Sequence, residues 1–287
     1  MINVLIVNWY SGFQCLKLVS SLVKSENAKY RIVLIDNGSS ESDIFNLKKC
    51  QDLASLSQVE FHLINNALNL GYAGGNNAGL EYLTKEKLVG DLLILNPDIV
   101  VQPNTLCIMS NVLKQHDVAG VMVRTLTVAG KIMYDSFSLK GFMQKWLISK
   151  NNQTVETDYL AGSCMMLNRT AIDRLGLFDN SFFLYWEEVD LSLRLKKSGY
   201  RLMSTNETFV LRVDNSFQRK FNSFYYLTRN AFLLLKSHST LTIINLFWYL
   251  LRMLMSSIII SLKSFNINFL LNYFKGVASG CYSYFYK

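Results

Sequence analysis

Short apolar runs bounded by turn-forming residues recur along the first half of the chain. The runs at 4–7 and 92–95 are continuous enough to predict buried strands, and the segments 31–35 and 60–64 predict two further strands. Between the first two, apolar residues at helical spacing predict a helix from Ser11 to about Val23. A strand, a helix and a second strand in this order favour a right-handed parallel crossover. The pattern therefore predicts an α/β fold with a Rossmann-like, mostly parallel sheet.

The second half continues the alternation less regularly. Residues 118–123 and 159–167 read as strands, and 168–175 reads as a short helix closed by Gly176. A further helix is expected from Glu187 to Ser198. The stretch 124–158 is polar and contains an aromatic cluster, and its pattern is less informative.

The C-terminal segment from Leu241 onward predicts helices with one narrow polar stripe. The stripe consists of Asn245, Arg252, Ser256 and Lys263 on an otherwise apolar helix. A membrane-spanning helix would place Arg252 in mid-bilayer at a cost of roughly 2.5–3.5 kcal/mol, whereas a helix lying in the membrane plane avoids it. A helix pair packed on the preceding domain or in a homodimer fits the same periodicity.

The charge distribution favours the membrane interpretation. The net charge is +8, and residues 212–287 hold nine basic residues and one acidic residue, so that this apolar segment carries the entire excess. Basic and apolar character together indicates an anionic membrane surface and not nucleic acid. Five scattered cysteines without paired spacing and an N-terminus without a basic leader lead us to expect a cytoplasmic protein, peripheral on the inner face of the cytoplasmic membrane.

Candidate chemistry gathers where the predicted strands end. Asn8 and Trp9 follow the first strand and Asp36 ends the second, so they are expected at one sheet edge, where ligands of open α/β sheets bind. An acid there suits a ribose hydroxyl or a base N–H, although Asp36 could equally cap the next helix. Asp98 follows the strand at 92–95, where a carboxylate can hold a divalent cation and through it a diphosphate, or can simply shape a turn.

A run of small residues follows the third strand, between Asn69 and Gly79. Glycines let the backbone approach a ligand, and a helix N-terminus attracts anions. A flexible loop is the alternative, but the small residues continue into the predicted helix at 76–83, as close packing requires. Gly162 and Ser163 similarly permit close approach of a ligand.

Five aromatic and apolar residues precede an acidic cluster made of Glu187, Glu188 and Asp190. The acids complement a helix dipole, and Asp190 can pair with Arg194 one turn later. Aromatic rings beside carboxylates are also a common way to stack sugars and bind their hydroxyls.

Taken in order, residues 36–39, 69–79 and 95–98 resemble the family 2 glycosyltransferases of the GT-A fold, and most closely bacterial rhamnosyltransferase-like members. The resemblance covers about residues 2–236 and implies that Asp98 is the metal-binding acid of an Asp-x-Asp element, with Mg²⁺ or Mn²⁺ as cofactor. Asn96 fills the first acid position. The nucleotide-sugar site is expected to comprise Asn8, Trp9, Asp36, Asn69, Gly74, Gly75, Asn76 and Asn96, and the acceptor site Gly162, Ser163, Trp186 and Glu187.

The resemblance also places the catalytic base in the 187–191 element, where Glu188 stands at the usual Asp position and Asp190 is the competing acid. Family members often carry a histidine within the segment that corresponds to 211–216. This chain has none there, and Arg212 is expected to meet the diphosphate instead.

These features predict a GT-A domain over 1–236 and basic, apolar helices over 237–287. The expected activity is inverting transfer of a sugar, rhamnose from dTDP-rhamnose, to a hydroxyl of a lipid-linked surface polysaccharide precursor. Two alternatives are a nucleotidyltransferase that forms a nucleotide sugar and a non-catalytic membrane-bound scaffold. The first would need a basic, glycine-rich loop after the first strand, where Asn8 to Gly12 stand, and the second would tolerate loss of Asp98 and Glu188.

Overall fold

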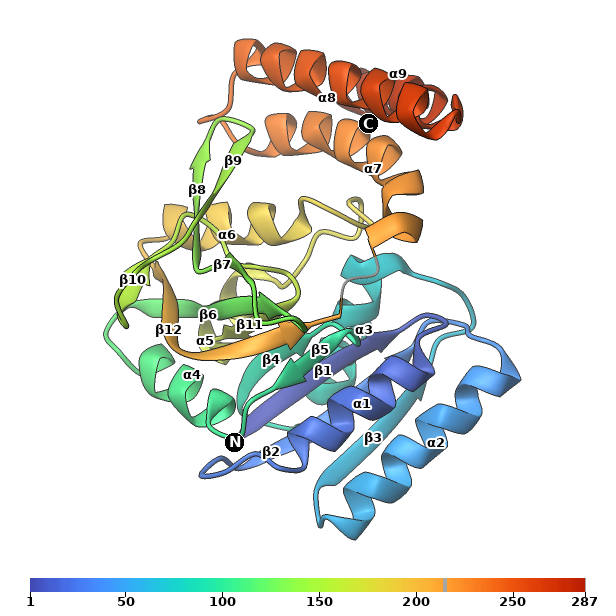
Figure 1. The fold of residues 1–287 in the computed structure, drawn as a ribbon. Coiled ribbons are helices and arrows are strands. Elements are labelled where there is room, and N and C mark those ends of the chain that lie inside the picture. The colour runs from blue at the N-terminus through green and yellow to red at the C-terminus, as the bar shows by residue number, and fades with distance from the viewer. Residues whose placement is uncertain (214–215, 287) are drawn as a thin grey trace.

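The computed structural model describes residues 1–213 and 216–286 and forms a ten-stranded mixed sheet with helices on both faces (Figure 1). The main strand order is β10 (Thr154–Glu156), β12 (Arg201–Arg212), β6 (Val118–Thr127), β11 (Cys164–Leu167), β4 (Asp91–Leu95), β1 (Ile2–Asn8), β2 (Tyr30–Asp36) and β3 (Glu60–Asn65). Four strands form the parallel half: β1 (Ile2–Asn8), β2 (Tyr30–Asp36), β3 (Glu60–Asn65) and β4 (Asp91–Leu95). The predicted α/β fold and its parallel crossovers are confirmed.

The other half of the sheet mixes strand directions. β11 (Cys164–Leu167) runs antiparallel between β4 and β6 (Val118–Thr127), and β12 (Arg201–Arg212) pairs parallel with β6. Short strands complete it: β5 (Ile99–Val101), β7 (Ile132–Tyr134) and β10 (Thr154–Glu156).

The strand predicted over 159–167 is wrong in its first half. Only 164–167 pair as a strand, because the chain turns just before them, where the Cys164 N–H donates to the Ala161 carbonyl at 3.2 Å. This turn places Gly162 and Ser163 at the end of the sheet.

A two-stranded hairpin within 124–158 stands away from the main sheet. It consists of β8 (Ser136–Lys140) and β9 (Met143–Leu147), and Phe137 at its base stacks on Tyr159 with ring centroids 4.4 Å apart. The tip of the hairpin rises toward the C-terminal helices (Figure 1).

Helices cover the two faces of the sheet. One face packs against α1 (Gly12–Leu22), α2 (Glu41–Leu56) and α4 (Thr105–Leu113), through a core that includes Ile6, Leu18 and Leu47. The other face packs against α3 (Gly71–Lys85), α5 (Arg169–Leu175) and α6 (Glu187–Lys197). The helices predicted at 11–23, 168–175 and 187–198 are therefore present.

The C-terminal helices are joined to this second core. α7 (Ser216–Ser237), α8 (Ile243–Ser264) and α9 (Asn268–Tyr286) pack together, and Gly280 on α9 lets that helix approach Phe232 of α7. The predicted tail helices are confirmed. Leu246, Tyr249 and Phe269 are buried in the same apolar cluster as residues of the sheet domain, so the helices after residue 236 share its core.

Candidate active site

The first part of the site lies at the carboxyl ends of β1 and β2. Asn8 and Asp36 pair across the two strands, and the Asn8 side-chain amide donates to Asp36 Oδ1 at 2.8 Å and to Asp43 Oδ2 at 2.6 Å. The Ser39 N–H donates to the other Asp36 oxygen at 3.0 Å. Asn8 and Asp36 are buried, whereas the Trp9 ring beside them is 54% exposed. The predicted meeting of Asn8 and Asp36 is confirmed, and Trp9 is available to stack on a planar ligand.

The small residues of 69–79 are mainly part of a helix. α3 begins at Gly71, five residues earlier than the sequence pattern predicts, and Asn69 Oδ1 accepts the Gly71 N–H at 2.9 Å. A Cβ on Gly75 would lie 2.7 Å from Val7 Cγ1, and one on Gly74 would lie 2.8 Å from Leu70 Cβ. Asn76 is fully buried and donates to the Tyr72 carbonyl. These residues fit α3 tightly against the sheet, and their contact with a nucleotide sugar stays a prediction.

The 96–98 turn brings β4 to the centre of the site. The Asn96 N–H donates to the Ser163 carbonyl at 3.0 Å, which joins the turn to the end of β11. Asp98 is 3% exposed, and Arg212 at the end of β12 donates its Nε–H to Asp98 Oδ2 at 3.0 Å. Arg212 thus lies directly at the predicted metal acid. Of the segment 211–216, residues 214 and 215 lie outside those that the structure describes.

A single carboxylate is the metal ligand that this geometry offers. Within residues 1–213 and 216–286 there is no group of three or more His, Cys, Asp and Glu side chains that could hold a metal ion. Mg²⁺ is often held by only one or two carboxylates together with substrate phosphates. Asp98 therefore fits a cation that arrives with a diphosphate, although the Asp98 carboxylate is already ion-paired with Arg212.

The loop before α6 has an unusual backbone. Phe183, Tyr185 and Trp186 all have positive φ, at 60°, 69° and 73°, which costs energy for residues with side chains. Asn230 on α7 holds this loop, because its buried side-chain amide lies within 2.8–2.9 Å of three loop carbonyls, those of Phe182, Leu184 and Tyr185. α7 therefore fixes where α6 begins.

Trp186 itself is part of the core. Its ring is 2% exposed, its indole N–H donates to the Leu227 carbonyl at 3.0 Å, and it packs edge-on against Phe142 and Tyr249. The expectation that this ring faces an acceptor sugar is contradicted by its burial. The Trp186 ring is packed between the hairpin, α7 and α8 and supports the acidic cluster from behind.

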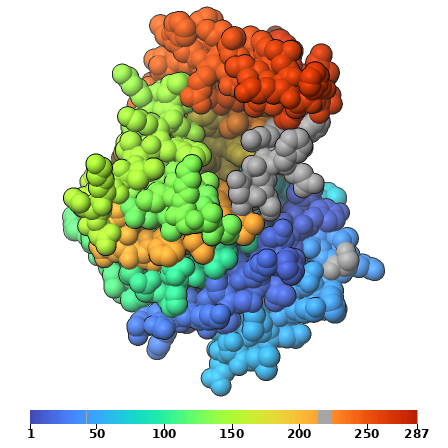
Figure 2. All heavy atoms as spheres, in the orientation of Figure 1, coloured from blue at the N-terminus to red at the C-terminus, as the bar shows by residue number. Residues whose placement is uncertain are grey.

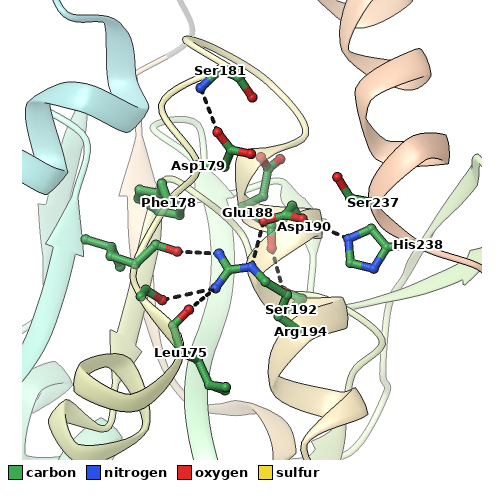
Figure 3. Close-up of polar contacts among 12 residues, drawn as sticks. Leu175, Phe178, Asp179, Ser181, Glu188, Asp190, Ser192, Arg194, Ser237 and His238 are labelled. Carbon is green, nitrogen blue, oxygen red and sulfur yellow. Dashed lines mark hydrogen bonds and ion pairs between the residues drawn. The ribbon is translucent and has the colours of Figure 1, made fainter. Parts of the chain in front are cut away.

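The acids at the start of α6 diverge (Figure 3). Asp190 lies between Arg194, whose Nε is 2.8 Å from Oδ2, and His238, whose Nε2 is 2.8 Å from Oδ1. Glu188 points away from this pair, and a Cβ on Gly162 would lie 3.7 Å from Glu188 Cβ. Glu187 is buried at 4% exposure. The predicted Asp190–Arg194 pair is confirmed, and Glu188 is the acid that borders the small residues at the end of the sheet.

Comparison with known protein families assigns the chain to a family. The family model described as "Glycosyl transferase family 2" matches residues 15–176, more than half of the chain. The chain belongs to glycosyltransferase family 2. It is therefore a glycosyltransferase, and the family resemblance seen in the sequence is confirmed.

Curated relatives are glycosyltransferases with modest identity. A low-salt glycan biosynthesis hexosyltransferase, Agl10, of Haloferax volcanii is 25% identical over 88% of this chain and 84% of its own length. The rhamnosyltransferase WbbL of Escherichia coli is 28% identical over 70% of this chain and 79% of its own. An N-acetylglucosaminyl-diphospho-decaprenol L-rhamnosyltransferase of Mycobacterium tuberculosis is 23% identical over 70% of this chain and 72% of its own.

Solved structures show the same fold. The mannosyltransferase PcManGT from Pyrobaculum calidifontis, in complex with GDP-Man and Mn²⁺, aligns with a TM-score of 0.63 and 10% identity over 98% of this chain and 87% of its own. GalNAc-T7 with UDP, GalNAc and Mn²⁺ aligns with a TM-score of 0.60 and 17% identity over 75% of this chain. The alignment covers 44% of GalNAc-T7, so the family 2 chain spans less than half of that protein. The GT-A fold is confirmed.

The three acids of this family 2 site have pKa values that are shifted in different ways by their surroundings. Burial, with the neighbouring Glu188, raises the pKa of Glu187 well above its usual range, and burial raises the pKa of Glu188 to about 7. Burial also raises the pKa of Asp190, but the hydrogen bond from His238 and the charge of Arg194 outweigh it and hold the pKa below its usual value. The raised pKa of Glu187 favours its protonated form, Asp190 is a charged member of an ion cluster, and Glu188 is poised to accept a proton near neutral pH.

Two tyrosines complete the surroundings of Glu188. The Tyr72 hydroxyl donates to the Gly162 carbonyl, and the Tyr134 hydroxyl lies 3.0 Å from Ser163 Oγ. Burial and the neighbouring acids Glu187 and Glu188 raise the pKa of Tyr72, so that it stays a neutral donor. Tyr72 lies within the 69–79 segment that carries the family resemblance, but its spacing did not indicate that its hydroxyl would reach Gly162. Tyr134 and His238 reach the site from segments without a recognisable motif.

Proposed function

We propose that this glycosyltransferase transfers rhamnose from dTDP-rhamnose, with inversion, to a hydroxyl of a lipid-linked surface polysaccharide precursor. The observation that carries the proposal is Glu188, a partly buried carboxylate with a pKa of about 7 beside Gly162, at the sheet end that also holds Asp98. The named rhamnosyltransferases among the relatives support the choice of sugar, and the decaprenol-linked substrate in one of their names supports the acceptor class.

In the proposed reaction Glu188 takes the proton of the acceptor hydroxyl while that oxygen attacks the anomeric carbon. The bond between the anomeric carbon and the nucleoside diphosphate breaks on the opposite face, which inverts the configuration. Mg²⁺ or Mn²⁺ held by Asp98 would supply neutralising charge to the diphosphate, and the Mn²⁺ in the structures of similar fold supports a divalent ion. Arg212, 3.0 Å from Asp98, can add a fixed positive charge at the same place.

Asn8, Asp36 and the exposed Trp9 are proposed to receive the nucleotide. Asp36 already accepts two hydrogen bonds within the protein, so a ribose hydroxyl would share an oxygen that is held in place. The Trp9 ring offers a stacking face for the base.

The proposal is tested with a thermal-shift and turnover panel of dTDP-rhamnose, UDP-glucose and GDP-mannose, each with Mg²⁺, Mn²⁺ or chelator. Specific donor binding stabilises the fold by mass action. We expect the largest metal-dependent shift and acceptor-dependent release of dTDP with dTDP-rhamnose. A larger thermal shift with another nucleotide sugar would identify that sugar, and not rhamnose, as the one transferred. Asp98→Asn should abolish the metal-dependent part of the thermal shift.

We also propose that the enzyme rests on the anionic inner surface of the cytoplasmic membrane through α8. Among the described residues one helix, Ile243–Ser264, is long and apolar enough to cross a bilayer, and about a fifth of its most apolar window is buried in the protein. Its buried face includes Tyr249, which packs on Trp186, so an in-plane position keeps these contacts. A homodimer through the same face is the competing arrangement.

The membrane proposal needs a variant that leaves the core intact. Truncation after Ser237 would remove His238 from Asp190 and Tyr249 from Trp186, so loss of binding would not be specific. Phe247→Glu changes a side chain that is 58% exposed and should reduce sedimentation with anionic vesicles without lowering the melting temperature. Unchanged vesicle binding, or a dimer that this variant dissociates, would count against the membrane.

A further inference from the structure

An apolar groove lies between the β8–β9 hairpin and α8, outside the residues assigned to donor or base. Its volume is about 540 Å³, and its walls include Phe142 and Met143 of the hairpin and Trp248, Leu251 and Met255 of α8. In the ribbon view the tip of the hairpin approaches the C-terminal helices (Figure 1).

Two cationic side chains line this apolar groove. Lys140 at the end of β8 and Arg252 on α8 both line it, and both are exposed. Arg252 contacts the Met143 sulfur at 3.7 Å, and in the part of the chain that the structure describes neither cation forms an ion pair with a carboxylate. The sequences of α8 and α9 contain no acid. The groove therefore pairs an apolar wall with uncompensated positive charge.

The apolar wall continues along the exposed face of α8. Ile244, Trp248, Leu251, Met255, Ile259 and Leu262 are each at least 40% exposed and recur three or four residues apart. A long apolar chain that entered the groove could thus extend along the helix.

The inner end of the groove touches the wall of the active site. The Phe142 ring, part of the groove, packs on Trp186 at 5.7 Å, and Trp186 directly precedes Glu187 and Glu188. The surface is hollowed below the C-terminal helices, with atoms of the yellow segment at the back of the hollow (Figure 2).

We propose that this groove binds the lipid diphosphate part of the acceptor, with the polyprenyl chain on the apolar wall and the diphosphate at Lys140 and Arg252. This inference rests on the proposed function and names the place that presents the lipid-linked saccharide to Glu188. A free phosphate would leave the apolar wall unused, and an uncharged chain would leave both cations unused. An isoprenoid diphosphate matches both chemistries at once.

The test measures binding of farnesyl diphosphate to the full chain by tryptophan fluorescence and calorimetry, because Trp248 lines the groove. The variant Lys140→Gln/Arg252→Gln is compared with Lys145→Gln/Arg174→Gln, which removes the same charge from exposed residues outside the groove. We expect the groove variant to weaken farnesyl diphosphate at least about tenfold and the control variant to leave it unchanged. Inorganic pyrophosphate and farnesol should each bind at least about tenfold more weakly than farnesyl diphosphate.

Equal losses in the two double variants would assign the effect to general charge and overturn the proposal, as would pyrophosphate binding as tightly as farnesyl diphosphate. Anionic vesicles distinguish a lipid surface from this groove: a groove variant that loses vesicle binding as strongly as farnesyl diphosphate binding would assign both cations to the membrane surface and overturn the proposal. With a lipid-linked acceptor, the groove variant should raise the acceptor KM and leave the donor thermal shift unchanged. Absence of any donor shift in the unmodified protein would instead refute the proposed function.

Discussion

Replacing Glu188 by Gln separates the catalytic role of this residue from its effect on stability. Glu188 is predicted to work as a carboxylate, and its pKa of about 7 makes turnover rise with pH through neutrality and level off above it. Glu188→Gln cannot take a proton, so transfer should fall roughly 10²–10⁴-fold and lose this pH dependence, with donor binding retained.

The same substitution should stabilise the protein at high pH. The folded pKa of Glu188 is raised from 4.5 to about 7, so the folded state binds more protons than the unfolded state between these values. Stability then falls as pH rises from 4.5 through 7, and the full cost is present above pH 7. The upper limit is about 3 kcal/mol, and because solvent screens this partly exposed side chain we expect about 1–3 kcal/mol.

The assay is urea unfolding at pH 4.5, 6 and 8, together with the pH profile of transfer. Glu188→Gln should be more stable than the unmodified protein at pH 8 and show a much smaller difference at pH 4.5. Burial and the neighbouring Glu188 raise the pKa of Glu187, which favours its protonated form, so Glu187→Gln should keep near-normal turnover at pH 7. Glu81→Gln, on the exposed face of α3, should change neither property.

Two results would refute the reasoning. Near-normal turnover in Glu188→Gln, with loss in Asp190→Asn, would move the base to Asp190. A stability difference independent of pH would show that Glu188 ionises in the folded protein as it does in the unfolded chain.

Other substitutions test the surroundings of the base. Asp190→Asn should lower the free energy of unfolding by roughly 1.5–3 kcal/mol at pH 7 and leave donor binding intact. Because the pKa of Asp190 is depressed, this loss should become smaller when urea unfolding is measured at lower pH. Asn230→Ala should reduce kcat more than donor affinity, since it frees the loop before Glu188, and equal effects on both would contradict a positioning role. Gly75→Ala should cost roughly 1–3 kcal/mol by overpacking against Val7, measured by thermal unfolding. A Cβ at Gly162 would lie no closer than 3.6 Å to any neighbouring atom, so Gly162→Ala should retain stability while raising the acceptor KM.

The local pattern determined the elements and the order of the motifs. Apolar runs predicted β1, β2 and β4, because a strand buried on both faces reads as a continuous hydrophobic segment. The edge strand β3 is only partly buried, and its segment contains Glu60 and His62. Parallel crossovers then required Asn8 and Asp36 to meet, and they do. The same rules placed Asp98 at a strand end and Glu188 in the first turn of a helix.

Contacts between distant segments decided what each of these residues does. His238 is 48 residues from Asp190, and Arg212 is 114 residues from Asp98, so no periodicity or spacing could predict that they pair. These contacts make Asp190 a structural ion and leave Glu188 to titrate near neutrality. Trp186 likewise has the sequence context of a sugar platform, but the packing of Phe142 and Tyr249 around it closes its ring off from solvent. Burial and charge are properties of the assembled neighbourhood, and a side chain acquires them only when the segments that form its walls have come together.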